Sequence, residues 1–333
     1  MARFSSRLVL IDGFAGPGRY LGGQPGSPLV MLDAYLSHAH KGLAHLSRVE
    51  LVYVFIEQDK RRVAALAKEL EAIALPANVK VSVIEGSFDV EMPKLLDAMP
   101  PGQSFAPTFA FIDPFGYTDH DLQLSSRILG FKRCEVLVYM PFPFIARFVD
   151  QESIAPALTR LYGDESWRAA QGKATLAERE AVLHDTFLVA LCRSAKYARS
   201  FEIIGNGGNT GYHLFFATGN LRGLEKMKEA MWKVDPVAGS TFADSTNSAQ
   251  LVLFADKPDL SPLERDVRRR FGVREFSIDD AGTFTLEATP FLPSHLKQVL
   301  REIEAAGLLT ARHPSKPRRR NTYPDGTLVT LKP

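Results

Sequence analysis

Short runs of apolar residues recur along the first part of the chain, and each run ends in a polar or glycine-containing turn. The runs occupy residues 8–11, 49–56, 79–85, 109–112 and 134–139. Runs of this length that are rich in Val, Ile and Phe predict buried strands. Because they end in turns that carry chemically useful residues, the pattern predicts an α/β fold with a crevice at the carboxyl ends of the strands.

The loop after the first run carries the first candidate binding site, and it consists of Asp12, Gly13, Phe14, Ala15, Gly16, Pro17 and Gly18. Glycines allow positive φ and a close approach of backbone to ligand. A nicotinamide dinucleotide site requires a third glycine, but Leu21 stands at that position. S-adenosylmethionine (SAM) has no phosphate, and its amino group favours a carboxylate such as Asp12. A glycine turn that merely packs is the alternative to a cofactor site.

The next two strand ends extend the cofactor hypothesis. Glu57 follows the second run, where the ribose hydroxyls of a bound nucleoside would lie, whereas Asp59 is predicted to cap the helix that starts at Lys60. Ser87 and Phe88 follow the third run in a turn of the kind that holds an adenine ring. The predicted cofactor-binding residues are Asp12, Phe14, Ala15, Gly16, Gly18, Glu57, Ser87 and Phe88.

The fourth strand ends in a turn suited to chemistry on an amine. Methylation of an exocyclic amino group needs hydrogen-bond acceptors and an aromatic face on which a base can stack. The Asp113 carboxylate and the Pro114 carbonyl are acceptors, and Phe115 or Tyr117 can stack. An ordinary Asp-Pro turn that contains Gly116 is the alternative interpretation.

These motifs together resemble one protein family. The segments IDGFAGPG, GSPL, FIE, IDPFGY, FATG and GLEKMK, at residues 11–18, 26–29, 55–57, 112–117, 216–219 and 223–228, are similar to the three-Cys-motif partner (TcmP) family. The resemblance implies a class I SAM-dependent methyltransferase fold and a partner with three cysteines that itself resembles radical-SAM enzymes. The wider amino-methyltransferase pattern Asp-Pro-Pro-Tyr is replaced here by Asp-Pro-Phe-Gly-Tyr at residues 113–117.

Composition excludes several other classes of protein. No apolar run approaches the roughly 18 residues of a membrane helix, and the first residues do not resemble a secretion signal, so we expect no membrane partner and a cytoplasmic location. Cys134 and Cys192 lack the spacing of a zinc site, and we expect no metal. Both are predicted to be small buried hydrophobic residues. Cys134 does not follow a proline, so it lacks the context of a cytosine-methyltransferase nucleophile.

The middle of the chain completes the predicted methyltransferase-like domain, residues 1–250. Residues 141–198 predict a helical insertion, in which Phe142 and Phe144 either pack beneath the helices or lie beside the substrate base. Runs at 201–204 and 212–217 predict a hairpin, and 221–234 predicts a helix on it. Small and polar residues up to about Ser248 predict a linker or a surface excursion.

The C-terminal residues, 251–333, predict a winged helix. Ser261 and Pro262 would begin one helix as its N-cap and first residue, and a second helix would start near residue 290 or 293 and end at Gly307. Runs at 308–311 and 328–331 predict two strands on either side of a basic loop. Two helices followed by a basic two-stranded wing are typical of this fold.

Positive charge is concentrated in the same region. Residues 308–333 contain six basic residues and one acidic residue, a net charge of +5, whereas the whole chain has +2. A basic loop can bind phosphates, and the preceding helix can enter a groove. The predicted nucleic-acid-binding residues are His295, Lys297, Arg301, Arg312, Lys316, Arg318, Arg319 and Arg320. A solvated tail and a protein-docking module are the alternatives.

Three functions remain compatible with the sequence. The first is SAM-dependent methylation of an amino group of a base in DNA or RNA, in association with the three-cysteine protein. The second is a non-catalytic DNA-binding subunit of a DNA processing or repair system that keeps the methyltransferase fold. The third is methylation of a protein or small molecule, which the basic wing disfavours.

Overall fold

The computed structural model describes residues 5–39, 41–99, 104–114, 116–204, 210–239, 241–243 and 258–333. The chain divides into two compact units, Met1–Ser200 with Thr210–Asn220 and Phe201–Asn209 with Leu221–Pro333. The sequence-predicted domain boundary at residues 250 and 251 lies outside the described residues. The longer segment of the second unit begins at Leu221.

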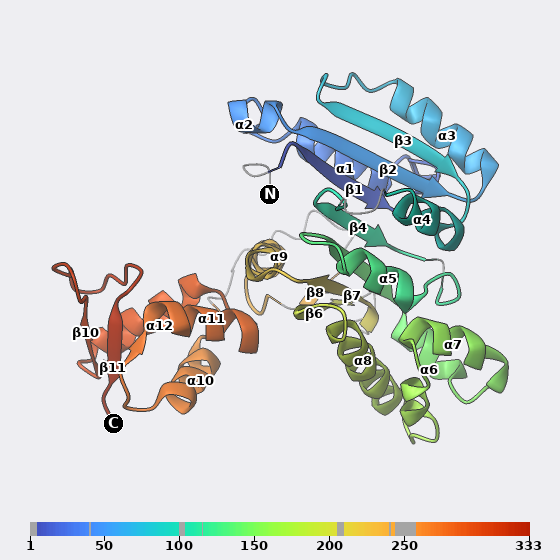
Figure 1. Ribbon diagram of the computed structural model, residues 1–333. Coiled ribbons are helices and arrows are strands. Elements are labelled where there is room, and N and C mark those ends of the chain that lie inside the picture. Colours follow the sequence, from blue (N-terminus) through green and yellow to red (C-terminus); the bar gives the residue numbers. More distant parts are fainter. Residues whose placement is uncertain are drawn as a thin grey trace. The chain divides into compact units, whose positions relative to one another are not determined.

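The first unit contains a mostly parallel sheet (Figure 1). Its strands are β1 (Arg7–Asp12), β2 (Glu50–Glu57), β3 (Val79–Glu85), β4 (Thr108–Ile112), β5 (Glu135–Met140) and β7 (Thr210–Thr218), with the start of β6 (Tyr197–Ile204). They follow the order β3-β2-β1-β4-β5-β7-β6. The first five strands pair in parallel, and β7 pairs antiparallel with β5.

Alternate side chains of a strand lie on opposite faces of this sheet, and both faces are buried. Leu51, Tyr53 and Phe55 of β2 join one apolar cluster with side chains from α1 (Ser27–Leu36) and α3 (Lys60–Glu71). Val54 and Ile56 join the other cluster. That cluster includes residues of α4 (Phe88–Asp97), α5 (Leu122–Leu129), α6 (Phe142–Phe148), α7 (Ala155–Tyr162) and α8 (Leu176–Cys192). A strand buried on both faces is apolar throughout, which explains the continuous runs in the sequence.

The helices between β5 and β6 correspond to the predicted insertion at 141–198. Within it, α8 begins with a capping box in which Thr175 and Glu178 satisfy each other's backbone amides. The described part of this unit also contains the short α2 (Ala44–Ser47) and the 3₁₀ turns Glu152–Ile154 and Ser166–Ala170. Phe142 is fully buried, whereas Phe144 is 46% exposed.

One of the two cysteine predictions is wrong. Cys134 is buried before β5, as expected, but Cys192 is exposed. Cys192 is the last residue of α8. A residue in the final turn of an amphipathic helix can face either solvent or the core.

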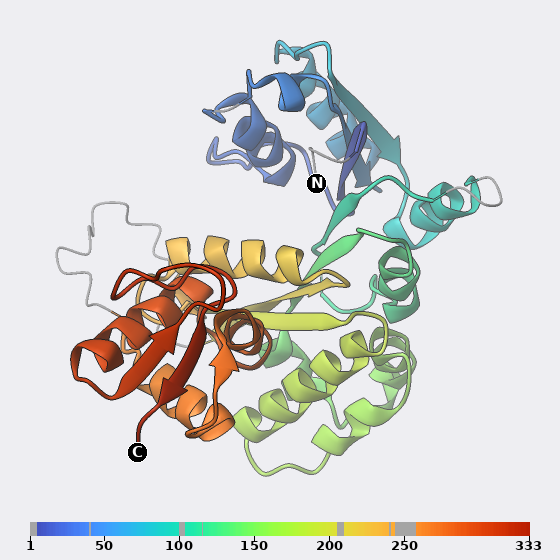
Figure 2. The same ribbon diagram turned by 60° about the vertical axis from the view of Figure 1, so that its left-hand side comes forward.

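The second unit contains a winged helix (Figure 2). Its helices are α10 (Ser261–Phe271), α11 (Ile278–Ala288) and α12 (Pro293–Ala305), and its strands are β9 (Phe276–Ser277), β10 (Leu309–Arg312) and β11 (Leu328–Leu331). The strands form an antiparallel sheet in the order β10-β11-β9. In α12, Leu296, Val299, Leu300 and Ile303 are buried, which is the spacing of an amphipathic helix.

Three details of this unit differ from the sequence prediction. The sequence pattern did not indicate α11 or β9. Helix α10 starts at Ser261, so Ser261 is not its N-cap. The backbone amide of Ser261 donates a hydrogen bond to the Asp259 carboxylate. Strand β8 (Thr241–Ala243) lies where a linker was expected and pairs in parallel with residues 202–204 of β6, while residues 244–257 lie outside the described residues.

Helix α9 (Leu221–Val234) is joined to the winged helix by a buried cation. The Lys228 side chain is 2% exposed, and its ammonium donates hydrogen bonds to the carbonyls of Thr285, Leu286 and Thr289. The indole of Trp232 donates to the Pro290 carbonyl at 3.0 Å. These bonds satisfy carbonyls at the C-terminal end of α11, where a positive charge is favoured.

Candidate active site and nucleic-acid interface

Hydrogen bonds from backbone amides of the glycine loop after β1 hold this loop to the end of β2. The Gly16 amide donates to the Glu57 carboxylate at 2.8 Å, and the Ala15 amide donates to the Ile56 carbonyl at 2.9 Å. Gly16 has φ +65, and a side chain there would meet no atom within 4 Å, so this loop position is open. Gly18 has φ +84 and lies against Leu66 of α3. The chain therefore uses Gly18 for packing and leaves space beside the Cα of Gly16, although Gly16 itself is buried.

Glu57 organises the centre of this loop cluster. Besides the Gly16 amide, the Glu57 carboxylate accepts the Asp59 amide at 2.8 Å. The backbone carbonyl of Glu57 accepts the Gly86 amide at 3.0 Å. Glu57 is only 3% exposed. Asp59 caps α3 by accepting the amides of Arg61 and Arg62, which confirms its predicted role.

Four of the eight predicted cofactor residues, Phe14, Glu57, Ser87 and Phe88, line one pocket, whereas Asp12, Ala15, Gly16 and Gly18 are not part of its lining. Phe14 lies with its ring centroid 5.6 Å from that of Phe88, which is buried at the start of α4. The pocket lining also includes two residues that the sequence did not single out, Gln58 and Asp119. The full lining is Gly13, Phe14, Glu57, Gln58, Gly86, Ser87, Phe88 and Asp119.

Asp12 is a buried carboxylate at the end of β1. Its Oδ1 accepts the Phe14 amide at 3.1 Å, and its side chain is fully buried. Its Oδ2 has no hydrogen-bond partner within the part of the chain that the structure describes. Burial raises the pKa of Asp12 to about 6, the nearby Glu57 charge adds to the increase, and bonds from Ser27 and Phe14 oppose it.

Asp113 lies at the end of β4, the strand next to β1. Burial raises the pKa of Asp113 to about 6, and the charge of Asp12 adds to this increase. Its neighbour Pro114 is buried. Phe115 lies outside the described residues, so its predicted stacking role has no structural description. Tyr117 packs against Phe144 of α6, with ring centroids 5.9 Å apart.

A pair of tyrosines beside Asp113 was not predicted from the sequence. Tyr139 of β5 and Tyr212 of β7 lie with ring centroids 4.7 Å apart. Tyr139 is opposite Leu214, so Tyr212 is its diagonal neighbour on the same face of the sheet. Ile112 of β4 pairs with Val138 of β5, so the next residues along these parallel strands, Asp113 and Tyr139, are neighbours. Burial raises the pKa of Tyr139, and the Asp113 charge contributes. The only signal in the sequence for this pair was the alternation of side chains within each apolar run. That alternation does not show which strands become neighbours in the sheet.

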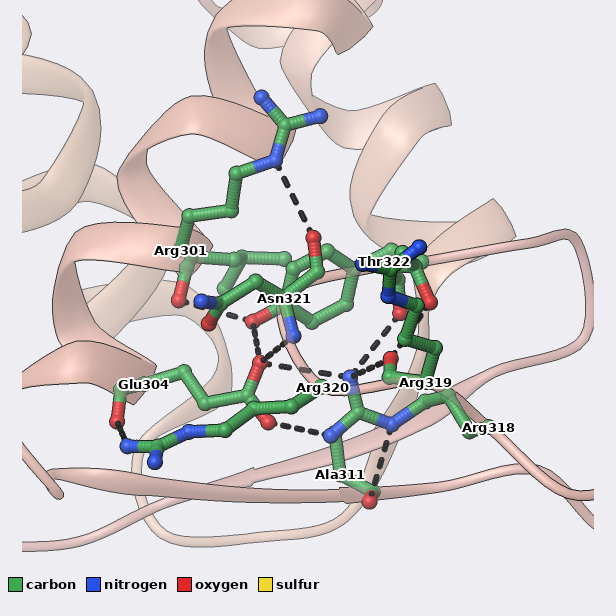
Figure 3. Close-up of polar contacts among 10 residues, drawn as sticks. Arg301, Glu304, Ala311, Arg318, Arg319, Arg320, Asn321 and Thr322 are labelled. Carbon is green, nitrogen blue, oxygen red and sulfur yellow. Dashed lines mark hydrogen bonds and ion pairs between the residues drawn. The ribbon is translucent and has the colours of Figure 1, made fainter.

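Some basic residues of the winged helix pair with acidic side chains of the protein, among them Arg312, which is 62% exposed. Arg312 makes two bonds to Glu275, at 2.7 and 2.9 Å. Arg318 forms an ion pair with Glu304 of α12 in which both side chains are 9% exposed (Figure 3). His295 packs against Trp232 with ring centroids 4.3 Å apart, and its Nδ1 accepts the Leu292 amide. Arg301, Lys316, Arg319 and Arg320 are exposed, and Lys297 is half-buried.

Comparison with known proteins gives one family match. The GMT-like winged helix-turn-helix domain matches residues 241–316. No curated protein matches the chain.

Solved structures with methyltransferase folds also match the chain. The O-methyltransferase TomG from Streptomyces achromogenes, solved with SAM, has 16% identity and a TM-score of 0.32 over 65% of this chain and 75% of that one. The N-terminal domain of human METTL16, solved with SAH, has 14% identity and a TM-score of 0.31 over 66% and 64%. A protein described as a methyltransferase from Porphyromonas gingivalis W83 has 12% identity and a TM-score of 0.31 over 66% of this chain.

The chain spans 38% of the Porphyromonas protein and 64% of the METTL16 domain. All three matches are at low identity and low TM-score. The fold assignment rests on the strand order and on the antiparallel β7, which together form a Rossmann-like sheet of the class I methyltransferase type. The protein therefore combines a methyltransferase-like α/β fold with a C-terminal winged helix.

Proposed function

We propose that the protein is a SAM-dependent methyltransferase that acts on an exocyclic amino group of a base in DNA or RNA. The observation that carries this proposal is the arrangement of Asp12 and Asp113 at the ends of neighbouring parallel strands, one beside the glycine loop and the other in the Asp-Pro turn. This arrangement supplies one carboxylate for the cofactor and one for the acceptor amine.

The residues around the glycine loop fit SAM. The buried Oδ2 of Asp12, which has no hydrogen-bond partner among the described residues, suits a cationic donor such as the amino group of SAM. The open position at Gly16 allows a ligand to approach the backbone, and Glu57 lies where ribose hydroxyls would need an acceptor. When bound, SAM would supply an electrophilic methyl group.

Asp113 and Pro114 would orient the acceptor amine. The Asp113 carboxylate and the Pro114 carbonyl accept hydrogen bonds from its two N–H groups, which directs the nitrogen lone pair. Because the pKa of Asp113 is about 6, its carboxylate is mostly ionised at neutral pH and still basic enough to take the proton that the amine loses as the N–C bond forms.

Aromatic side chains beside Asp113 support a planar substrate. The Tyr139–Tyr212 pair offers a ring surface near the carboxylate, and Tyr117 lies on the same turn as Asp113. A base that is removed from its helix is stabilised by such stacking. We place the base on this surface.

The winged helix would bind the nucleic-acid backbone. The exposed cations Arg301, Lys316, Arg319 and Arg320 can contact phosphates, whereas Arg312 and Arg318 already pair with acidic residues of the protein. We assign phosphate contacts to the exposed group.

A second candidate is a non-catalytic DNA-binding subunit that works with a three-cysteine-motif partner. It is favoured by the departure from the Asp-Pro-Pro-Tyr pattern, because Gly116, with φ +97, stands at the position of the aromatic residue, and the aromatic Tyr117 follows one residue later. Both oxygens of Glu57 also accept backbone amides already.

Transfer of a tritiated methyl group from SAM to DNA and RNA pools, with and without the three-cysteine partner, separates the two candidates. We expect incorporation with the wild type and a decrease of about 100-fold or more in Asp113→Ala, as the loss of a positioned acid–base group typically produces. Calorimetry should show that Asp113→Ala still binds SAM. Binding of SAM without methyl incorporation into any nucleic acid would support the non-catalytic candidate.

The tyrosine pair gives a second test of the same site. Tyr139→Ala should raise KM for the nucleic acid by about 10-fold, because one stacked base contributes about 1–3 kcal/mol. Tyr139→Phe keeps the ring and should leave KM almost unchanged. Equal KM values for the two variants would remove Tyr139 from the substrate site.

A further inference from the structure

Glu304 is an acidic residue at the centre of the predicted nucleic-acid interface. It lies in α12, the helix that precedes the wing, and its side chain is 9% exposed. Its carboxylate accepts hydrogen bonds from the Arg318 guanidinium, from the Asn321 amide at 2.9 Å and from the Tyr323 hydroxyl at 2.8 Å. Burial acts to raise the pKa of Glu304, but these donors outweigh it and hold the pKa below its usual value.

Arg318 lies inside the wing and does not face solvent. Its Nε donates to the Ala311 carbonyl at 3.2 Å, and a terminal nitrogen donates to the Thr322 carbonyl at 2.9 Å. Its guanidinium also lies 5.4 Å from the centre of the Tyr323 ring. The loop between β10 and β11 therefore folds around the Glu304–Arg318 pair (Figure 3).

The same pair brings exposed cations from two elements together. Arg319 and Arg320 directly follow Arg318 in the wing, and Arg301 precedes Glu304 by one turn of α12. The Nε of Arg301 donates to the Asn321 carbonyl at 3.2 Å, and Arg320 reaches the Glu304 carbonyl at 3.4 Å. The wing is thus attached to the helix next to its own exposed arginines.

We propose that Glu304 is a positioning residue that increases affinity for nucleic acid, although it is acidic, because it holds Arg301, Arg319 and Arg320 as one phosphate-binding surface. This inference rests on the nucleic-acid part of the proposed function. Breaking a buried ion pair on one side is costly because it leaves the other charge without a partner. Without Glu304, Arg318 would leave its buried position, and the wing arginines would lose their fixed distance from Arg301.

A simple electrostatic account predicts the opposite sign. Removing a negative charge near phosphates raises the net positive charge and should strengthen binding. Glu302 provides the matched control, because it lies on the same helix and is exposed. Among the contacts described, its side chain is hydrogen-bonded only to Gln298. Glu304→Gln and Glu302→Gln therefore change net charge equally, but only the first breaks the Glu304–Arg318 pair.

The experiment measures binding of the full chain to a fluorescent DNA duplex by anisotropy over a range of salt concentrations. Glu302→Gln should bind as tightly as the wild type or more tightly. Glu304→Gln should bind more weakly, and the slope of log affinity against log salt should fall by about 0.9 for each phosphate contact that is lost. Tighter binding by both variants would overturn the inference.

A second pair of variants preserves charge and covers the case in which Glu304→Gln fails to fold. Arg318→Lys keeps the charge but cannot make the several directional bonds of the guanidinium, so the salt slope should fall. Arg319→Lys keeps an exposed charge and should leave the slope almost unchanged. Equal slopes for the two variants would contradict the inference. If the wild-type chain shows no salt-dependent binding, the nucleic-acid function itself is wrong, and the inference fails with it.

Discussion

Asp12 and Asp113 occupy the carboxyl ends of the neighbouring parallel strands β1 and β4, and the charge of Asp12 contributes to the raised pKa of Asp113. The two residues are about 100 positions apart in sequence. Two ionised carboxylates that interact where little water reaches them lower the stability of the folded state. Residues that destabilise a fold in this way are expected at functional sites.

Asp12→Asn should make the protein more stable at neutral pH. The pKa of Asp12 is raised from 3.8 to about 6 in the folded state, so its contribution to stability is lost as pH rises from 3.8 through 6. Removing the charge should increase the free energy of unfolding by up to about 3 kcal/mol above pH 6, since one pKa unit corresponds to 1.36 kcal/mol. Denaturant unfolding at pH 7.5 and near pH 4 measures this difference.

The gain should shrink to about 0.5 kcal/mol near pH 4, where the folded state is protonated and the unfolded state is about half protonated. Asp33→Asn in α1 is the control, because Asp33 is exposed and its substitution should change stability little. A gain from Asp12→Asn that is equal at both pH values would argue against the raised pKa.

Gly16→Ala should weaken SAM binding with a moderate loss of stability. The φ of +65 costs a residue with a side chain roughly 1–2 kcal/mol, and the added methyl group would project into the open loop position. Calorimetry with SAM and thermal unfolding measure the two effects. Gly282→Ala is the matched control, because Gly282 lies in α11, has room for a methyl group, and should gain helix stability. Unchanged SAM affinity in folded Gly16→Ala would remove this loop from the cofactor site.

The rate of methyl transfer should depend on pH through Asp113. Because the pKa of Asp113 is about 6, the rate should rise as pH increases through 6 and level off above about pH 7, once the carboxylate is ionised. The profile of kcat against pH measures this dependence. In Asp113→Asn the residual activity should lack the rise near pH 6, and a rise that persists in that variant would assign the titration to another group.

Lys228→Met should destabilise the second unit. The substitution leaves the carbonyls of Thr285, Leu286 and Thr289 without their buried donor, and each unsatisfied group costs about 1–3 kcal/mol. Amide hydrogen exchange in α11 should become faster. Lys226→Met, on the same helix, removes an exposed ion pair with Glu229 and should change little. Similar exchange in the two variants would show that Lys228 does not hold α9 to the winged helix.

The sequence alone indicated the elements that carry the candidate active site. Runs such as residues 49–56 are apolar on both faces, and such strands belong to parallel sheets covered by helices. In these sheets, ligands bind at the carboxyl ends of the strands, so the order of runs and turns was enough to predict that Asp12, Glu57 and Asp113 lie near one another. Their grouping needed only the pattern of the chain and a general rule of topology.

The tertiary structure decided which side chains are available at that site and in the wing. Tyr139 and Tyr212 become neighbours only because β7 pairs with β5, and local alternation carries no information about that pairing. Arg318, Arg319 and Arg320 are identical residues in a row, yet Arg318 is buried because Glu304 and Tyr323 surround it. Burial of a charged side chain is costly unless a partner compensates for the loss of water, and the partners of Arg318 come from another part of the chain. The sequence therefore determined the positions of the charges, and long-range contacts determined which of them can meet a ligand.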